Sequence, residues 1–151
     1  MKILKLFLLI LVVCITFPKC KKTISSPTQS SWTLDNVKYK PSDVIYLSGG
    51  NEIQAEQPGN YVLIYFSDSL KNNTQYSVTD SLNFAYNTGT NNCFITLGKN
   101  WVTYASSSQL GNSISIKISN GEVTASFSNV PVLDSINNQI MLSGTFIASI
   151  N

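Results

Sequence analysis

Residues 113–128 read SISIKIS-NG-EVTASFS, and this stretch decides the fold class. Apolar and polar side chains alternate on both sides of Asn120-Gly121, and a period of two residues predicts β-strands. Asn-Gly adopts the positive φ values of a type I′ turn, so the two strands are expected to pair as a two-residue hairpin. One face of this hairpin is then apolar, with the cross-strand pairs Ile118–Val123, Ile116–Ala125 and Ile114–Phe127.

The same alternation continues through the chain, and turn-forming residues interrupt it at short intervals. It predicts further strands at 31–34, 37–40, 43–48, 52–56, 61–67, 74–79, 82–87, 92–98, 101–105 and 139–150. Asp35-Asn36 is expected to form a tight turn, and no segment keeps the 3.6-residue period of a helix for long. We therefore expect an all-β fold: a single antiparallel β-sandwich of roughly 8–10 strands, with a small β-barrel as the alternative.

The N-terminus has the pattern of a secretory signal. Lys2 and Lys5 precede an apolar run that ends at Pro18, and this run is shorter than the ~20 apolar residues of a membrane-spanning helix. The polar sequence that follows, with a proline and no hydrophobic period, is typical of a tether. The expected organisation is a signal peptide at 1–19, a lipidated cysteine and tether at 20–31, and one β-sandwich domain at 32–151.

Cys20 is the expected lipidation site and first residue of the mature protein, which would anchor the protein to a membrane of the cell envelope. The residues before it depart from the usual pattern, because Phe17 and Lys19 stand where a leucine-like and a small residue are common. The alternative is ordinary cleavage after Ser25, which would give a soluble secreted protein. Cys93 alternates with apolar residues in a predicted strand and is expected to be a small buried side chain.

Charge argues against a nucleic-acid partner. The chain has ten basic residues, all of them lysine, and eight acidic residues. Five of the ten lysines precede Thr23, so five remain in the domain against all eight carboxylates. The domain is therefore mildly acidic, whereas phosphate recognition depends on clustered Lys and Arg.

The missing residue types exclude several kinds of active site. The chain has no histidine and no arginine. Sites of the Ser-His-Asp and Cys-His types and histidine-based zinc sites are therefore excluded, as is bidentate arginine recognition of carboxylate or phosphate. We expect no catalytic residues, no metal and no cofactor, and we interpret the protein as a non-enzyme.

Two weaker possibilities remain for the acidic residues. A glycoside hydrolase needs two facing carboxylates, and Glu52 and Glu56 could share one strand face. Calcium needs several oxygen ligands from one or two loops, and the stretches at 134–138 and 67–73 supply Asp and Asn side chains. Both stretches read more simply as turns.

Aromatic residues give the positive hint of a binding surface. In the stretch YVLIYF both faces of the predicted strand are apolar or aromatic, with Tyr61 and Tyr65 on the same face. Trp101 and Tyr104 in WVTY are expected on opposite sides of their strand, so one of them lies outside the main core. Tyr61, Tyr65 and Trp101 are the predicted ligand platform, suited to stacking against a sugar or an apolar ligand. The alternative is that these rings pack under loops or at the sheet rim.

Four elements recur in a known kind of protein: the signal ending in CKK, the pattern W-x-x-(D/N)-x-x-x-Y at 32–39, G-x-V-(T/S)-x-x-F at 121–127, and S-G-T-F at 143–146. Together they resemble small lipoproteins of unknown function from Bacteroidota. The resemblance implies a single antiparallel sandwich on a lipidated N-terminus at the cell envelope, and it carries no catalytic residues to this chain.

The expected function is a non-catalytic binding or structural module of the cell envelope. Its expected partners are the membrane, through the N-terminal lipid, and a glycan or an envelope protein, with no nucleic acid. A carbohydrate-binding or adhesin-like surface subunit is the alternative, and a carboxylate-dependent glycoside hydrolase is a third reading.

Overall fold

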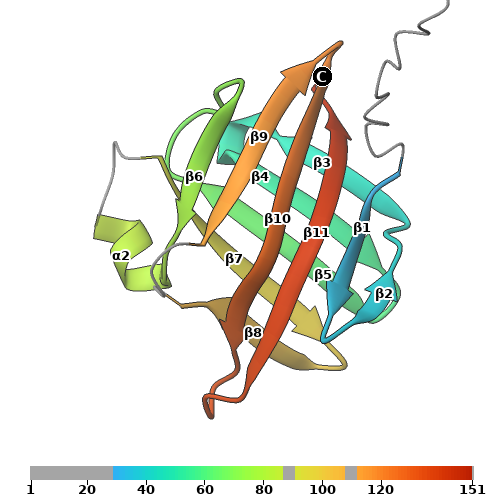
Figure 1. Ribbon diagram of the computed structural model, residues 1–151, viewed down its shortest axis with the longest axis vertical. Coiled ribbons are helices and arrows are strands. Elements are labelled where there is room, and N and C mark those ends of the chain that lie inside the picture. The colour runs from blue at the N-terminus through green and yellow to red at the C-terminus, as the bar shows by residue number, and fades with distance from the viewer. Residues whose placement is uncertain (1–28, 87–90, 108–111, 151) are drawn as a thin grey trace, which may run out of the picture.

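A computed structural model describes residues 29–86, 91–107 and 112–150, and these residues form one large sheet (Figure 1). The predicted signal and most of the tether, including Cys20, lie outside the described residues. A short 3₁₀ turn, η1 (Ser48–Gly50), and one helix, α2 (Ser81–Tyr86), interrupt the strands. The strands are β1 (Ser31–Leu34), β2 (Val37–Tyr39), β3 (Asp43–Leu47), β4 (Glu52–Gln57), β5 (Asn60–Phe66), β6 (Thr74–Val78), β7 (Asn92–Lys99), β8 (Val102–Ser106), β9 (Ser113–Ser119), β10 (Glu122–Leu133) and β11 (Gln139–Ser149).

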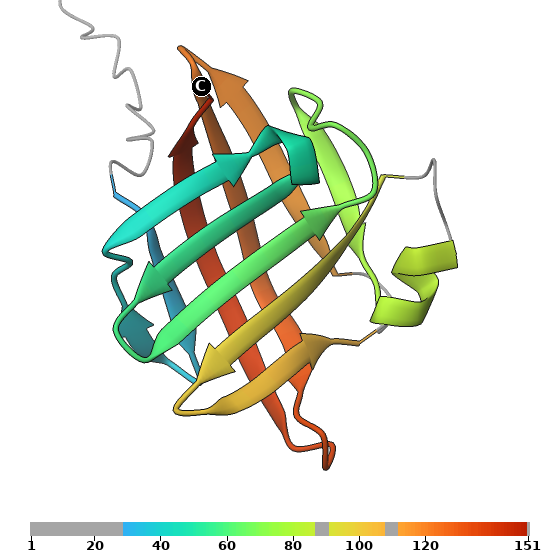
Figure 2. The same ribbon diagram turned by 180° about the vertical axis from the view of Figure 1, so that it is seen from behind.

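The sheet closes on itself through β8. Its order is β2-β1-β11-β10-β9-β6-β7-β5-β4-β3, and β8 pairs with both β7 and β10. The strands β10, β9, β6, β7 and β8 therefore form a closed ring, while the remaining strands extend from it and bring β3 and β4 against β11. Figure 1 shows β9–β11 as one layer with β4, β5 and β7 crossing behind it, and Figure 2 shows the same two layers with β4, β5 and β7 in front. The all-β prediction is confirmed, and the ring corresponds to its barrel alternative.

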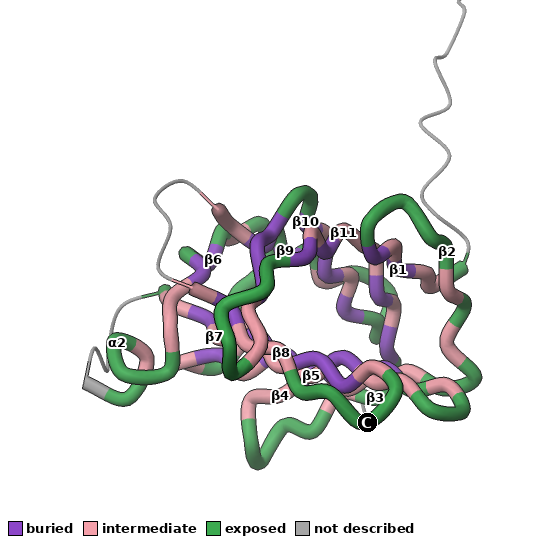
Figure 3. Tube along the Cα trace, turned by 90° about the horizontal axis from the view of Figure 1, so that it is seen from below, coloured by how far each residue is buried: buried purple, intermediate pink, exposed green. Residues whose placement is uncertain are grey.

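The hairpin at 113–128 forms in the predicted register for two of its three predicted pairs, whereas Ile114 pairs with Tyr76 of β6. Ile118 pairs with Val123 and Ile116 with Ala125, and the register continues to Ser115 and Ser126. Asn120 and Gly121 have φ values of 53° and 75°, as the type I′ turn requires. The predicted apolar face is buried apart from Ile118, which is half-buried. Figure 3 shows the buried stretches along the strands and the exposed stretches mainly at the turns between them.

The core is continuous between the two layers. Trp32 is fully buried, stacks on Tyr39 and meets Phe146 edge-on. Gly144 lies opposite Trp32, and a Cβ there would come within 3.1 Å of the Trp32 Cβ. A side chain at 144 would therefore be in tight contact with Trp32, and its neighbours would have to shift by a few tenths of an ångström.

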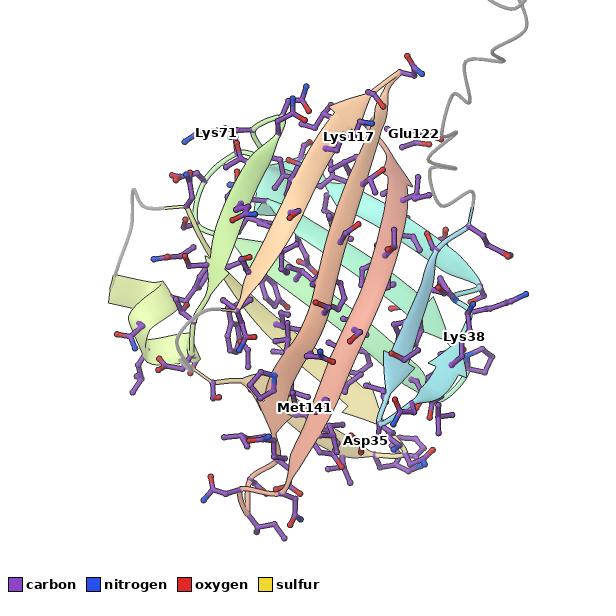
Figure 4. The ribbon with its side chains drawn as sticks, in the orientation of Figure 1. Asp35, Lys38, Lys71, Lys117, Glu122 and Met141 are labelled. Carbon is purple, nitrogen blue, oxygen red and sulfur yellow. The ribbon has the colours of Figure 1, made fainter. Side chains whose placement is uncertain are left out.

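The first hairpin is tied to β11 through Asp35. Asp35 and Asn36 have positive φ values, which confirms the predicted tight turn. The Met141 backbone N–H donates to Asp35 Oδ1 at 3.0 Å, and the Asp35 N–H donates to the Met141 carbonyl at 3.1 Å (Figure 4). These bonds fix the β1–β2 turn against the strand that β1 pairs with.

The predicted strand at 82–87 is wrong, because α2 begins at Ser81 and includes five residues of that stretch. Asp80 caps this helix: its Oδ1 accepts from the Asn83 N–H at 2.7 Å and its Oδ2 from Asn83 Nδ2 at 2.8 Å. The connection that contains the helix leads from β6 to β7, which pair in parallel. Parallel strands need a crossover connection of this kind. All other pairings between the described strands are antiparallel.

The part of the chain that the structure describes contains no helix long and apolar enough to cross a membrane. Cys93 is buried, as the alternation predicts, and it is a free cysteine within the part of the chain that the structure describes. Burial raises the pKa of its thiol.

Candidate functional site

The outward side of β4, β5 and β7 forms a surface that we call the aromatic face. Figure 2 looks onto these strands. The alternate residues of each strand, such as Ile53, Val62 and Ile95, are fully buried in the core, so the others point outward. The aromatic face consists of Glu52, Gln54 and Glu56 of β4, Tyr61, Leu63 and Tyr65 of β5, and Phe94, Thr96 and Gly98 of β7.

Tyr61 lies directly across the backbone of β7. It pairs with Gly98, and a Cβ built on Gly98 would come within 2.2 Å of Tyr61 Cε1. No side chain fits between the ring and the strand. Because Gly98 has no side chain, the Tyr61 ring can lie directly against the backbone of β7. Glycine in a strand often marks such a close approach.

Trp101 occupies the turn between β7 and β8 rather than the predicted strand at 101–105, which begins at Val102. Its φ is 71° and that of Asn100 is 50°, close to the values in the β9–β10 turn (Asn120, Gly121) and in the β1–β2 turn (Asp35, Asn36). Glycine normally fills the second position of a type I′ turn, because a Cβ is strained at positive φ. Trp101 is nevertheless fully exposed, at 105% of its reference area, so no burial of the ring offsets this strain.

A hollow of about 400 Å³ lies between the β4–β5 turn and the β7–β8 turn, which we call the Tyr61–Trp101 hollow. This volume is within the range of about 300–1,000 Å³ that is usual for small-molecule sites. The Asn100 N–H donates to the Gly59 carbonyl at 3.3 Å and links the two turns. The lining residues are Glu56, Gln57, Gly59, Asn60, Tyr61, Gly98, Trp101, Val102 and Thr103.

The lining combines aromatic surface with hydrogen-bonding groups. Gln57 brings an amide that donates and accepts, and Glu56 brings one carboxylate. The Asn60 Oδ1 atom is buried and has no hydrogen-bond partner among the described residues. No lysine lines the hollow, so it offers no cationic side chain to an anionic ligand.

Tyr65, the third residue of the predicted platform, lies outside this hollow. It stacks on Phe94 with ring centroids 6.2 Å apart, and Phe84 of α2 lies 6.1 Å from Phe94. Desolvation and the nearby charge of Glu52 raise the pKa of the Tyr65 phenol, while a hydrogen bond with Thr96 opposes them. The structure thus brings Tyr61 and Trp101 together and places Tyr65 in a second aromatic group on the same sheet.

The carboxylates of this region do not form a cleft. Glu52 and Glu56 are four residues apart on β4, which corresponds to about 13 Å along a strand. Glycoside hydrolases hold their two carboxyl groups about 5–9.5 Å apart. Asp43 and Glu56 are cross-strand neighbours, but the hollow beside them is about 30 Å³, the volume of about one water molecule.

The loop at 134–138 is an internally bonded turn. The Asp134 carboxylate accepts from the N–H groups of Ile136 and Asn138 at 2.9 and 2.8 Å, and from Asn138 Nδ2 at 2.9 Å. Among the described residues, no three of Cys, Asp and Glu gather as a possible metal site.

Sequence reasoning did not identify Gly98, Asn60 or Phe94 as part of this region. A usable signal was present at 98–101, where Gly-Lys-Asn-Trp separates two alternating runs. This signal is weak, because glycine rather than an aromatic residue normally fills the second position of such a turn.

Comparison of the chain with protein-family models, curated proteins and solved structures finds no match.

Proposed function

We propose that the protein is an exported, non-catalytic binding module of the cell envelope that binds neutral carbohydrate in the Tyr61–Trp101 hollow. One observation carries the proposal: a fully exposed tryptophan occupies a turn position where glycine would be more stable. Residues with a strained backbone that no structural contact offsets are most common at functional sites. The ring adds nothing to the core, so selection for ligand contact explains why it is there.

The lining of the hollow supports carbohydrate as the ligand class. A sugar ring presents C–H bonds on its faces and hydroxyl groups at its edge. Its face packs on an aromatic ring such as Trp101 or Tyr61, and its hydroxyls need both donors and acceptors, which the Gln57 amide and the Glu56 carboxylate supply. The absence of a lining cation disfavours phosphate and carboxylate ligands.

Two observations support a non-catalytic role. The chain has no histidine to act as a general base near neutral pH. The outward carboxylates of β4 are spaced too far apart for a retaining or inverting pair. The proposal therefore assigns Glu56 to hydrogen bonding of the ligand rather than to proton transfer.

The proposed anchor is an acylated Cys20, and the start of the domain is compatible with it. The described chain begins beside β11, where Ser30 Oγ accepts from the Ile147 N–H at 2.9 Å. This is the layer opposite the aromatic face (Figures 1 and 2).

Strand donation, as in a pilus-like subunit, has less support. The ends of the sheet path are β2 and β3, which have three and five residues. Lys38 and Asp43 place charges on these edges. Short, charged edge strands are a common protection against pairing with another chain.

The test is a glycan array probed with wild type and with Trp101→Ala, Tyr61→Ala and Ile136→Ala. Ile136 is a matched control because it is an exposed apolar residue at another turn. We expect wild type and Ile136→Ala to bind the same neutral glycans, and the two aromatic variants to lose that binding. Equal binding by all four proteins would contradict the proposed site.

Anchoring is tested by the intact mass of the protein purified from its native membranes, beside Cys20→Ser. A diacyl or triacyl increment in wild type alone supports the proposed anchor. An unmodified mass that begins at Ser26 would support the secreted alternative.

A further inference from the structure

A second aromatic group lies on the same sheet as the Tyr61–Trp101 hollow. Tyr65 and Phe94 are paired across β5 and β7, and their rings stack at 22°. Both side chains are half-buried, so part of each ring remains accessible. The group is separate from the hollow and contributes none of its lining.

The two aromatic groups are aligned along β5. Tyr61 and Tyr65 lie on the same face, four residues apart, which corresponds to about 13 Å along the strand. One sugar ring is too short to reach both. Leu63 and Thr96 are cross-strand partners between them, so the surface between the two groups is continuous.

A row of polar side chains runs beside the aromatic residues. Each polar residue of β4 pairs with one residue of β5, in the register Glu56–Tyr61, Gln54–Leu63 and Glu52–Tyr65. Gln54 Nε2 donates to Glu56 Oε1, which ties two members of the row together. A linear glycan needs this arrangement: apolar surface under its rings and hydrogen-bonding groups along its edge.

The charge of the face limits the kind of glycan. Asp43, Glu52 and Glu56 all project from the outward side of β3 and β4, and no lysine occupies an outward position of β3, β4, β5 or β7 in the aligned register. These carboxylates disfavour an acidic polysaccharide at both ends of the face.

From this placement we propose that the aromatic face is a linear track for a neutral polysaccharide chain, with a first subsite at Tyr61–Trp101 and a second at Tyr65–Phe94. This inference rests on the proposed function and adds the length and charge of the ligand. The two subsites bind different rings of one chain, so a chain that spans both binds more tightly than a short one.

The first experiment needs no variant. Binding of wild type is measured by calorimetry with neutral oligosaccharides from one to six sugar units, taken from the glycan that binds in the array. We expect affinity to rise at least tenfold between the disaccharide and the hexasaccharide. Equal affinity for all lengths would overturn the track and leave the first subsite standing. No binding of any neutral glycan would overturn both the track and the proposed function.

The second experiment assigns the subsites. Tyr65→Ala should lower hexasaccharide affinity about tenfold and leave disaccharide affinity unchanged, whereas Trp101→Ala should abolish both. Tyr65→Phe retains the ring and should bind like wild type, as should the control Ile136→Ala. If Tyr65→Ala folds and keeps the full preference for long chains, the second subsite is wrong. Tighter binding of a polygalacturonate hexamer than of the neutral hexamer would overturn the assigned charge.

Discussion

Replacing Trp101 by glycine is expected to stabilise the protein while it removes the proposed ligand contact. Trp101 holds a φ of 71° at the second position of a two-residue turn and is fully exposed. A residue with a Cβ costs about 1–2 kcal/mol in the left-handed region, and glycine avoids this cost. The ring buries no area, so its removal sacrifices no hydrophobic stabilisation.

The net gain is smaller than the strain that is relieved. Glycine is more flexible in the unfolded chain, which returns about 0.5–1 kcal/mol to the unfolded state. We therefore expect Trp101→Gly to raise the free energy of unfolding by about 0.5–1 kcal/mol, equivalent to a melting temperature higher by about 2–5 °C. Trp101→Ala keeps the strain and should change stability by less than about 0.5 kcal/mol.

The assay is urea denaturation followed by circular dichroism, with thermal melting as a second measurement. Gly121→Ala is the matched control, because Gly121 has the same turn position with a φ of 75°. An added Cβ there meets no atom within 4 Å, so this variant reports backbone strain alone. It should lose about 1 kcal/mol. If Trp101→Gly instead lowers the free energy of unfolding by 1 kcal/mol or more, the ring stabilises the fold and the reasoning from exposure and strain fails.

Three other changes test separate parts of the structure. Gly98→Ala places a Cβ within 2.2 Å of the Tyr61 ring, so glycan binding and thermal stability should both fall, and adding Tyr61→Ala should recover the stability but not the binding. The Cys93 thiol is buried with a raised pKa, so it should stay unmodified by iodoacetamide at pH 8 until urea unfolds the protein; rapid labelling of the native state would contradict its burial. Although desolvation works in the other direction, hydrogen bonds from Asn138 and Ile136 hold the pKa of Asp134 below its ordinary value. The stability from these bonds is then present above about pH 4, the unfolded pKa, and is lost as the pH falls through the lower folded pKa; Asp134→Ala should remove that part of the acid sensitivity in denaturation curves, and an unchanged pH profile would argue against it.

Local rules predicted the hairpin at 113–128 well, because alternation and turn chemistry both act on neighbouring residues. The same rules failed at 81–86, where α2 is only six residues long and too short to show a helical period. Its one available signal was Asp80, which caps the helix. A helix of this length depends on its position in the crossover from β6 to β7, which the alternation pattern does not encode.

Ring closure was beyond local reasoning for a different reason. It requires β8 to pair with β10, in the register Ala105–Leu133 and Ser106–Val132, between segments far apart in the sequence. The predicted strands do not include 130–133, where Pro131 interrupts the apolar run. β10 tolerates this proline after an irregularity between Phe127 and Val130.

The candidate site was predictable only in part. Alternation alone places Tyr61 and Tyr65 on one side of β5, where the structure has them. Trp101 is placed on the same hollow as Tyr61 only through the β7–β8 hairpin. The turn of this hairpin has tryptophan at the position that glycine normally fills. The left-handed backbone conformation of Trp101 is therefore the feature that the sequence rules missed, and it is also the strongest structural argument for a binding site.

The most direct test of the binding site follows the two tryptophan indole N–H signals by ¹H–¹⁵N NMR during titration with a neutral oligosaccharide that binds in the array. Trp32 is fully buried and serves as an internal control, and Trp101→Phe assigns the exposed signal. We predict that the Trp101 signal shifts saturably, with the Kd measured by calorimetry, while the Trp32 signal stays in place. Saturable binding that leaves the Trp101 signal unmoved would contradict the assignment of the site to the Tyr61–Trp101 hollow.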